Sequence, residues 1–168
     1  MIPTLRCPRL DLIAPDASCE SAYDRFYTDA QASAAYGGPL TAAAAWSRLV
    51  YDVGSWHFQG FGVWAMRRHS DHEILGVCGF WQARGWPREL TWWLQTAARG
   101  QGYALEASRA AIEHAYAHFG WDSVQTYMSD ANAAAKALVA RLGGVRVARR
   151  PFPDGEDRDV YEFPRAGA

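Results

Sequence analysis

The pattern of apolar residues predicts a mixed α/β (α+β) fold, in which helices pack on a twisted, mostly antiparallel sheet. Three short apolar runs, residues 61–68, 74–81 and 89–95, follow one another with turn signals between them, which is typical of an antiparallel meander. Residues 101–119 instead repeat core-type side chains at spacings of three and four, the period of a helix with one buried face. We expect about seven strands and about four helices, in the order β-α-α-β-β-β-α-β-α-β-β.

The segments before the meander predict an edge strand and two helices. Residues 4–13 are typical of an edge strand that is interrupted by a proline. Residues 18–35 and 41–53 are predicted as helices, and a Gly-Gly-Pro segment separates them. We expect the Thr41 hydroxyl to cap the second helix, because it can accept a hydrogen bond from a backbone N–H that has no partner within the helix.

The second half of the chain is predicted to alternate between helices and strands. The helix at 101–119 is followed by a strand at 123–128, an alanine-rich helix at 132–142, and closing strands at 145–148 and 159–163. A helix that links two strands usually returns the chain to the end of the sheet where the first strand began. The strands on either side of helix 101–119 are therefore expected to run parallel.

The length and composition are those of one folded domain spanning residues 1–168. Of the 168 residues, 49% are apolar and 21% are charged, a balance that is typical of globular proteins. The formal net charge of −1 gives no electrostatic reason to expect nucleic acid or an anionic membrane as a partner. No apolar stretch approaches the ~18 residues that a membrane-spanning helix needs.

The cysteine and histidine patterns predict neither disulfides nor a metal site. Cys7, Cys19 and Cys78 are odd in number and widely spaced, which fits a protein of the reducing cytoplasm. His114 and His118 stand four residues apart on one predicted helix, a spacing that metal ligands use. Since no third ligand is near them in the sequence, we expect both histidines to be solvated.

A strand, a short loop and a helix start follow one another at residues 92–104, and the loop is suited to bind phosphate. The first turn of a helix has backbone N–H groups without intrahelical partners, and the helix dipole adds partial positive charge there. Gly100 and Gly102 allow a ligand to approach the backbone closely. Arg99 can add a charged fork to a phosphate oxygen. A plain strand-to-helix turn would have much the same composition, so the loop alone leaves both interpretations open.

The longer segment 99–107 is more specific. Its sequence, R-G-Q-G-Y-A-L-E-A, resembles the acetyl-CoA signature R-G-x-G-Y-A-x-E-A of the GNAT N-acetyltransferase superfamily, and most of all its RimJ/RimL-like branch. The shorter superfamily pattern [QR]-x-x-G-x-[GA] is met by Arg99, Gly102 and Ala104. This resemblance implies a GNAT-like fold and the transfer of an acetyl group from acetyl-CoA, as cosubstrate, to a primary amine by direct attack in a ternary complex.

The resemblance also implies which residues hold acetyl-CoA. Backbone amides of the glycine-containing loop would bind the pyrophosphate, and the strand at 89–95 would pair with the pantetheine arm. Asn132 would reach the arm from the far side, although an ordinary helix N-cap explains this residue equally well. The expected cofactor-binding residues are Trp92, Trp93, Leu94, Arg99, Gly100, Gln101, Gly102, Tyr103, Ala104 and Asn132.

For the chemistry, the resemblance implies a carboxylate base at the start of the same strand, and Glu89 stands there. A solvated carboxylate at a strand end is the alternative interpretation. The positions where the family often has a Ser or Tyr as the acid carry Ala135 and Val139, neither of which can donate a proton. Tyr127 and Tyr161 are the candidate substitutes. The absent acid leaves a second function open, namely a non-catalytic sensor that binds acyl-CoA.

The acceptor is expected to be a small-molecule or peptide amine, and a homodimer is left open. Aromatic side chains could line the acceptor site, because a ring face attracts a cation. A dinucleotide site is the weaker alternative, since Leu105 replaces the third glycine of that motif. The tryptophans on elements expected to border the acceptor site are Trp46, Trp56, Trp64, Trp81 and Trp86.

Overall fold

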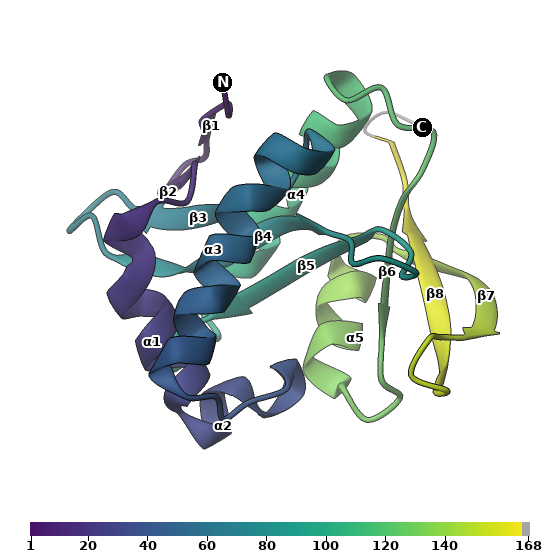
Figure 1. Cartoon of the computed structure of the whole chain (residues 1–168). Helices are drawn as coiled ribbons and strands as arrows, with labels where there is room; N and C mark the ends of the chain where they lie inside the picture. Colours follow the sequence, from purple (N-terminus) through teal and green to yellow (C-terminus); the bar gives the residue numbers. More distant parts are fainter. Residues whose placement is uncertain (166–168) are drawn as a thin grey trace.

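The strands of the computed structural model, which describes residues 1–165, form two antiparallel sheets (Figure 1). The first sheet has the order β1-β2-β3-β4-β5, and the second has the order β6-β8-β7. The strands of the first sheet are β1 (Leu5–Arg6), β2 (Leu10–Ile13), β3 (Val63–Arg68), β4 (Ile74–Trp81) and β5 (Glu89–Leu94). Those of the second sheet are β6 (Val124–Met128), β7 (Val145–Pro151) and β8 (Asp157–Phe163).

Helices cover both faces of the five-stranded sheet (Figure 1). The side chains of β3 alternate between these faces, as expected for a strand that is buried on both sides. Trp64 and Met66 belong to the core under α4, whereas Val63 and Ala65 belong to the core under α1 and α3. The α-helices of the described residues are α1 (Glu20–Thr28), α2 (Ala30–Ser33), α3 (Ala42–Gln59), α4 (Tyr103–Ala117) and α5 (Ala133–Arg141).

The two sheets meet where β5 begins. The Thr126 hydroxyl on β6 donates a hydrogen bond to the Leu90 carbonyl on β5 at 2.8 Å. In the described residues β5 and β6 belong to separate sheets and form no ladder, so the expected parallel pairing is not formed. The side chain of one threonine takes the place of a backbone pair, and β5 keeps one edge unpaired.

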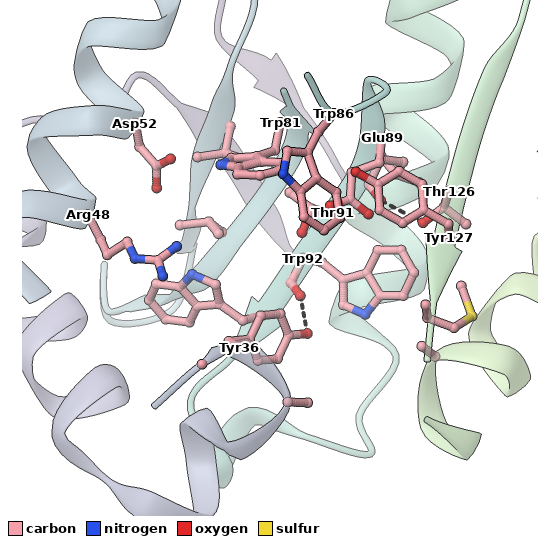
Figure 2. A pocket seen from close by; sticks show the side chains of 18 of the residues that line it. Tyr36, Arg48, Asp52, Trp81, Trp86, Glu89, Thr91, Trp92, Thr126 and Tyr127 are labelled. Carbon is pink, nitrogen blue, oxygen red and sulfur yellow. Dashed lines mark hydrogen bonds between the residues drawn. The ribbon is translucent and has the colours of Figure 1, made fainter. Parts of the chain in front are cut away.

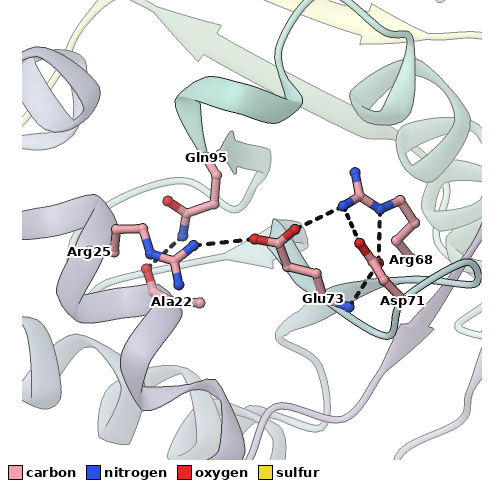
Figure 3. Close-up of polar contacts among 6 residues, drawn as sticks. All are labelled: Ala22, Arg25, Arg68, Asp71, Glu73 and Gln95. Carbon is pink, nitrogen blue, oxygen red and sulfur yellow. Dashed lines mark hydrogen bonds and ion pairs between the residues drawn. The ribbon is translucent and has the colours of Figure 1, made fainter.

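Polar contacts fasten α1 to the strands below it (Figure 3). Gln95 follows β5 and donates its side-chain amide to the Ala22 carbonyl on α1 at 2.8 Å. Arg25 of α1 pairs with Glu73 at 3.2 Å, and Glu73 also pairs with Arg68 of β3 at 2.8 Å. The Gln95 contact is buried, so it orients α1 more firmly than the exposed ion pairs do.

The expected elements are present, with differences near the N-terminus. The helix predicted over 18–35 is interrupted at Asp29, whose side chain accepts two N–H groups and starts α2. The Thr41 cap is confirmed, because its hydroxyl accepts the Ala44 N–H at 3.2 Å. The helix that Thr41 caps continues to Gln59, six residues beyond the predicted end, because apolar contacts support the extra turns. The predicted first strand consists of two short strands, so the described residues contain eight.

Two further findings concern features that the sequence had raised. In residues 1–165, no helix combines the length and the apolar character needed to span a membrane. His114 is 8% exposed and packs edge-on against Trp64 and Phe119, so the expectation that both histidines are solvated is wrong for this one. Burial and the neighbouring His118 lower the pKa of His114. Within the same residues, no three potential metal-ligating side chains gather at one place.

Candidate active site

A cleft of about 930 Å³ opens beside the unpaired edge of β5 (Figure 2). Its floor comes from β5, one wall comes from α3 and the α2–α3 connection, and the other wall comes from β6 and the start of α5. The same strand that was expected to carry the chemistry therefore lies at the bottom of this cleft. The hydroxyl, carboxyl, amide and guanidinium side chains that line it are Tyr27, Tyr36, Ser47, Arg48, Tyr51, Asp52, Glu89, Thr91, Thr126, Tyr127, Ser129, Asn132 and Arg158.

Side-chain alternation along β5 directs Glu89 into this cleft. Residues two apart on a strand share a face, and Glu89, Thr91 and Trp93 all line the cleft. Burial raises the pKa of Glu89 to about 8, although Arg158 and the Tyr127 hydroxyl act in the opposite direction. Glu89 is half-buried and lines the cleft, so its carboxyl lies at the cleft wall.

The backbone of β5 offers alternate residues to the open edge. The Gln95 N–H donates to Leu75 on β4 at 2.7 Å, so the backbone groups of Trp93 also face β4. Those of Leu90 and Trp92 face the other way, and their carbonyls accept the hydroxyls of Thr126 and Tyr36, respectively. Of the three residues expected to pair with the pantetheine arm, only Trp92 and Leu94 present their backbone to the opening; that of Trp93 is used by the sheet.

The glycine-containing loop has the conformation that a helix-start phosphate site requires. Gly100 and Gly102 have φ angles of 74° and 82°, which residues with a Cβ rarely adopt. Gly102 is the N-cap of α4, so the backbone N–H groups of the next residues point out of the helix start. The Arg99 guanidinium donates to the carbonyls of Leu94 and Ala32, at 3.3 and 2.9 Å, and thus ties the loop to β5 and α2.

Arg9, which the sequence did not single out, supports this loop from the side. Its guanidinium donates to the Gln101 carbonyl at 2.9 Å and lies 4.5 Å from the centre of the Tyr103 ring. It also pairs with Glu106 at 2.7 Å. Glu106 therefore holds Arg9, and Arg9 connects the first sheet to the start of α4. No local motif marks Arg9, because its partners lie about a hundred residues away in the chain.

The far wall of the cleft contains the remaining predicted residues. Asn132 lines the cleft and caps α5, since its side-chain oxygen accepts the Ala135 N–H at 3.1 Å. Of the two candidate acids, Tyr127 lines the cleft, and its hydroxyl donates to the Pro87 carbonyl at 3.0 Å. Tyr161 packs against the core instead and is not among the lining residues.

Only two of the five tryptophans expected at the acceptor site border the cleft. Trp81 and Trp86 line it, with ring centres 6.2 Å apart. Trp56 and Trp64 are core residues, 7% and 0% exposed, because they lie on buried faces of α3 and β3. Trp46 points to solvent and is 53% exposed. The sequence shows which elements carry the rings, but the face that each ring takes depends on packing.

Sequence reasoning missed three cleft residues that come from the α2–α3 region: Tyr36, Arg48 and Asp52. Arg48 and Asp52 are four apart on α3 and so share a face of the helix. Burial raises the pKa of Asp52 to about 7, while Tyr23 and Arg48 act against it; the Tyr23 hydroxyl donates to this carboxylate at 2.7 Å. A charged residue on the apolar side of a helix is the one signal that could have identified Asp52.

Comparison with known proteins assigns this arrangement to a family. A family model described as "Acetyltransferase (GNAT) domain" matches residues 9–145. The chain belongs to the GNAT acetyltransferase family. An acetyltransferase from Agrobacterium tumefaciens str. C58 has 30% sequence identity and a TM-score of 0.88, covering 98% of this chain and 96% of that one. The family membership predicted from residues 99–107 is confirmed, and the protein is an acetyltransferase.

Two more distant structures share the fold of this GNAT protein. RimL, described as a ribosomal L7/L12 alpha-N-protein acetyltransferase, has 17% identity and a TM-score of 0.76, covering 96% of this chain and 94% of that one. The Microcin C7 self-immunity acetyltransferase MccE, in complex with acetyl-CoA and AMP, has 13% identity and a TM-score of 0.73, with 92% of each chain covered. The fold is thus the one expected for the RimJ/RimL-like branch. No curated protein matches the sequence significantly.

Proposed function

We propose that this GNAT protein transfers an acetyl group from acetyl-CoA to a primary amine by direct attack in a ternary complex, with Glu89 as the general base. One observation carries the proposal: Glu89 projects into the cleft from the strand whose open edge faces the second sheet, and its pKa is raised to about 8. A base whose pKa lies near the working pH combines a useful deprotonated fraction with strong affinity for a proton.

The loop and strand fit acetyl-CoA, which supplies the activated thioester. The α4 helix start directs backbone N–H groups outward where a pyrophosphate would bind. A Cβ added at Gly100 would meet no atom within 4 Å, so the loop surface is open there. Trp92 and Leu94 present backbone groups along the adjoining edge, and Asn132 lies across the cleft. The acetyl-CoA bound by the MccE structure supports this assignment.

Arg99 has a different role in this proposal from the one that its sequence position suggests. Because its guanidinium bonds to two backbone carbonyls, it holds the loop in place. The pyrophosphate contacts then come mainly from the backbone amides of the loop. Tyr127 is the candidate for proton return, since its hydroxyl lines the cleft next to Glu89, whereas Ala135 and Val139 carry only hydrocarbon.

A first test is the shift in thermal midpoint with acetyl-CoA, with NAD and ATP as controls. A ligand at about 100 times its Kd stabilises the fold by about 2.7 kcal/mol, which corresponds to several degrees for a chain of this size. A shift with acetyl-CoA alone supports the donor site. Release of CoA thiol with a panel of amines then tests transfer, and Glu89→Gln should slow it about 100-fold or more.

The hydrocarbon side chains at positions 135 and 139 favour one alternative, a sensor that binds acyl-CoA without catalysis. The two functions differ in one measurement. Stabilisation by acetyl-CoA without thiol release for any amine of the panel would support the sensor and contradict the transferase.

A further inference from the structure

Three hydrogen-bond donors gather at the end of the cleft away from Glu89. They are the Arg48 guanidinium from α3, the Tyr27 hydroxyl from α1 and the Trp93 indole N–H from β5, and all three residues line the cleft. Arg48 lies 5.7 Å from the centre of the Tyr27 ring, and the Tyr27 and Trp93 rings are 5.8 Å apart. Three elements thus bring their donors to one place.

The Trp93 N–H has no acceptor. Trp93 is 3% exposed, and its indole nitrogen is the one buried side-chain polar atom in residues 1–165 that has no hydrogen-bond partner. Its ring is held between neighbours, stacked on Phe26 at 4.1 Å and edge-on to Tyr23 at 5.2 Å. A buried donor without an acceptor costs about 1–3 kcal/mol. The indole nitrogen itself has no surface exposed to the cleft, and its N–H acts on the neighbouring Tyr27 hydroxyl, so a ligand in the cleft would contact Tyr27 and Arg48 and not the indole N–H.

Arg48 is likewise a cation without an anion. Among the described residues it forms no ion pair, even with Asp52 one turn away on α3, whose carboxylate accepts the Tyr23 hydroxyl instead. The other arginine of the cleft, Arg158, is already paired with Asp154 at 2.6 Å. Arg48 therefore supplies a positive charge at this end of the cleft that no carboxylate of the described residues contacts directly.

These donors define a subsite for an anion of single charge. The Arg48 guanidinium and the Tyr27 hydroxyl provide the donors, while the Asp52 carboxyl that lines the same cleft accepts the Tyr23 hydroxyl and is shifted towards its neutral form by burial. One net positive charge then balances a carboxylate better than a phosphate dianion. Figure 2 shows Arg48 across the cleft from Glu89 and Tyr127, with Trp81 and Trp86 between them. Glu89 and Trp93 stand four residues apart on β5, which separates their Cα atoms by about 13 Å.

We propose that the amine acceptor carries a carboxylate at the end opposite its amine, and that Arg48 and Tyr27 bind this carboxylate while the rings of Trp81 and Trp86 cover an apolar middle. This inference rests on the proposed function for the position of the amine, but the anion subsite itself can be tested without catalysis. Two sources share the chemistry: an ω-amino acid, and a short peptide with an unblocked C-terminus.

Calorimetric binding to the full chain tests the subsite with matched pairs of ligands. One arm compares 6-aminohexanoate with its amide, and the other compares trialanine with its C-terminal amide. The carboxylate form should bind about 10- to 100-fold more tightly in at least one arm, the range expected for a hydrogen bond to a charged group. The arm that shows the preference identifies the source of the carboxylate.

Variants connect the preference to the residues. Arg48→Gln should abolish it, and Tyr27→Phe should reduce it. Arg48→Glu should reverse it, so that 1,6-diaminohexane binds more tightly than 6-aminohexanoate. Arg109→Gln, which removes an exposed arginine of α4, should leave it unchanged. A preference ratio is insensitive to partial unfolding, because both members of a pair lose the same fraction of folded protein.

The outcomes separate this inference from the proposed function. Equal binding of both members in both arms, or no binding of either carboxylate form at about millimolar concentration, overturns the subsite. An Arg48→Gln variant that keeps the preference overturns it as well. Carboxylate binding without any acetyl transfer retains the subsite and contradicts the transferase. Transfer to amines regardless of their carboxylate retains the transferase and contradicts the subsite.

Discussion

The Thr126 hydroxyl of β6 donates to the Leu90 carbonyl of β5 at 2.8 Å, and this bond joins the two sheets at the end of β5 next to Glu89. Thr126 is 2% exposed and Leu90 is fully buried, so no water can replace the bond. The separation of the strands beyond this point leaves the edge at Trp92 and Leu94 open. One side chain thus fixes where the cleft begins.

Thr126→Val should therefore destabilise the protein by about 1–3 kcal/mol, because it keeps the shape of the side chain but leaves a buried carbonyl without a donor. Urea unfolding measures the change. Thr28→Val is the matched control, since the Thr28 hydroxyl donates to a carbonyl on the exposed side of α1. If the two variants lose equal stability, the Thr126 bond does not hold the sheets together.

The raised pKa of Glu89 predicts how catalysis depends on pH. The ratio of kcat/KM between the wild type and Glu89→Gln cancels the ionisation of the acceptor amine. Because the carboxyl is protonated below its folded pKa of about 8, the ratio should be largest above pH 8 and fall towards lower pH, about tenfold per unit. A ratio that stays constant between pH 6 and pH 9 would show that Glu89 is not the base.

Asp52 predicts a pH dependence of stability instead. Burial raises its pKa from 3.8 to about 7 in the folded protein, so the folded state binds a proton that the unfolded state releases. This contribution is fully present below about pH 4 and is lost as the pH rises through 7, by at most about 1.4 kcal/mol per unit.

The Asp52→Asn variant cannot ionise, so its stability relative to the wild type should increase between pH 5 and pH 8. Urea unfolding at both pH values measures this difference, and the contribution of Glu89 is common to both proteins. Asp24→Asn, at an exposed position of α1, controls for the loss of one negative charge. A difference that is the same at both pH values would contradict the raised pKa of Asp52.

Any side chain at position 102, at the start of α4, should lower the stability of the folded protein. With φ at 82°, Gly102→Ala should lose about 1–2 kcal/mol, and the strained loop should bind acetyl-CoA more weakly. Gly54→Ala is the control, because Gly54 lies within α3 and an added Cβ meets no atom within 4 Å. That variant should gain about 0.5–1 kcal/mol. The thermal midpoint with and without acetyl-CoA distinguishes the two effects.

Local features of the sequence were sufficient for much of the site. The glycines at 100 and 102 are in the conformation that only glycine adopts easily, and Glu89 faces the cleft because strand residues alternate. The caps at Thr41 and Asn132 are also local, since each side chain bonds to a backbone group three residues on. In each case, the interaction that decides the structure joins residues close in the chain.

Only the tertiary structure decided what the cleft contains. Tyr27, Arg48 and Trp93 come from a helix, a second helix and a strand, and no spacing in the sequence relates them. The same holds for Arg9 beside Glu106, and for the tryptophans, of which Trp64 is buried and Trp81 is not. Periodicity tells which side of an element is apolar, but which elements meet there depends on how the whole core packs. The conformation of the glycine-containing loop was thus determined locally, whereas the lining of the cleft is a consequence of the fold.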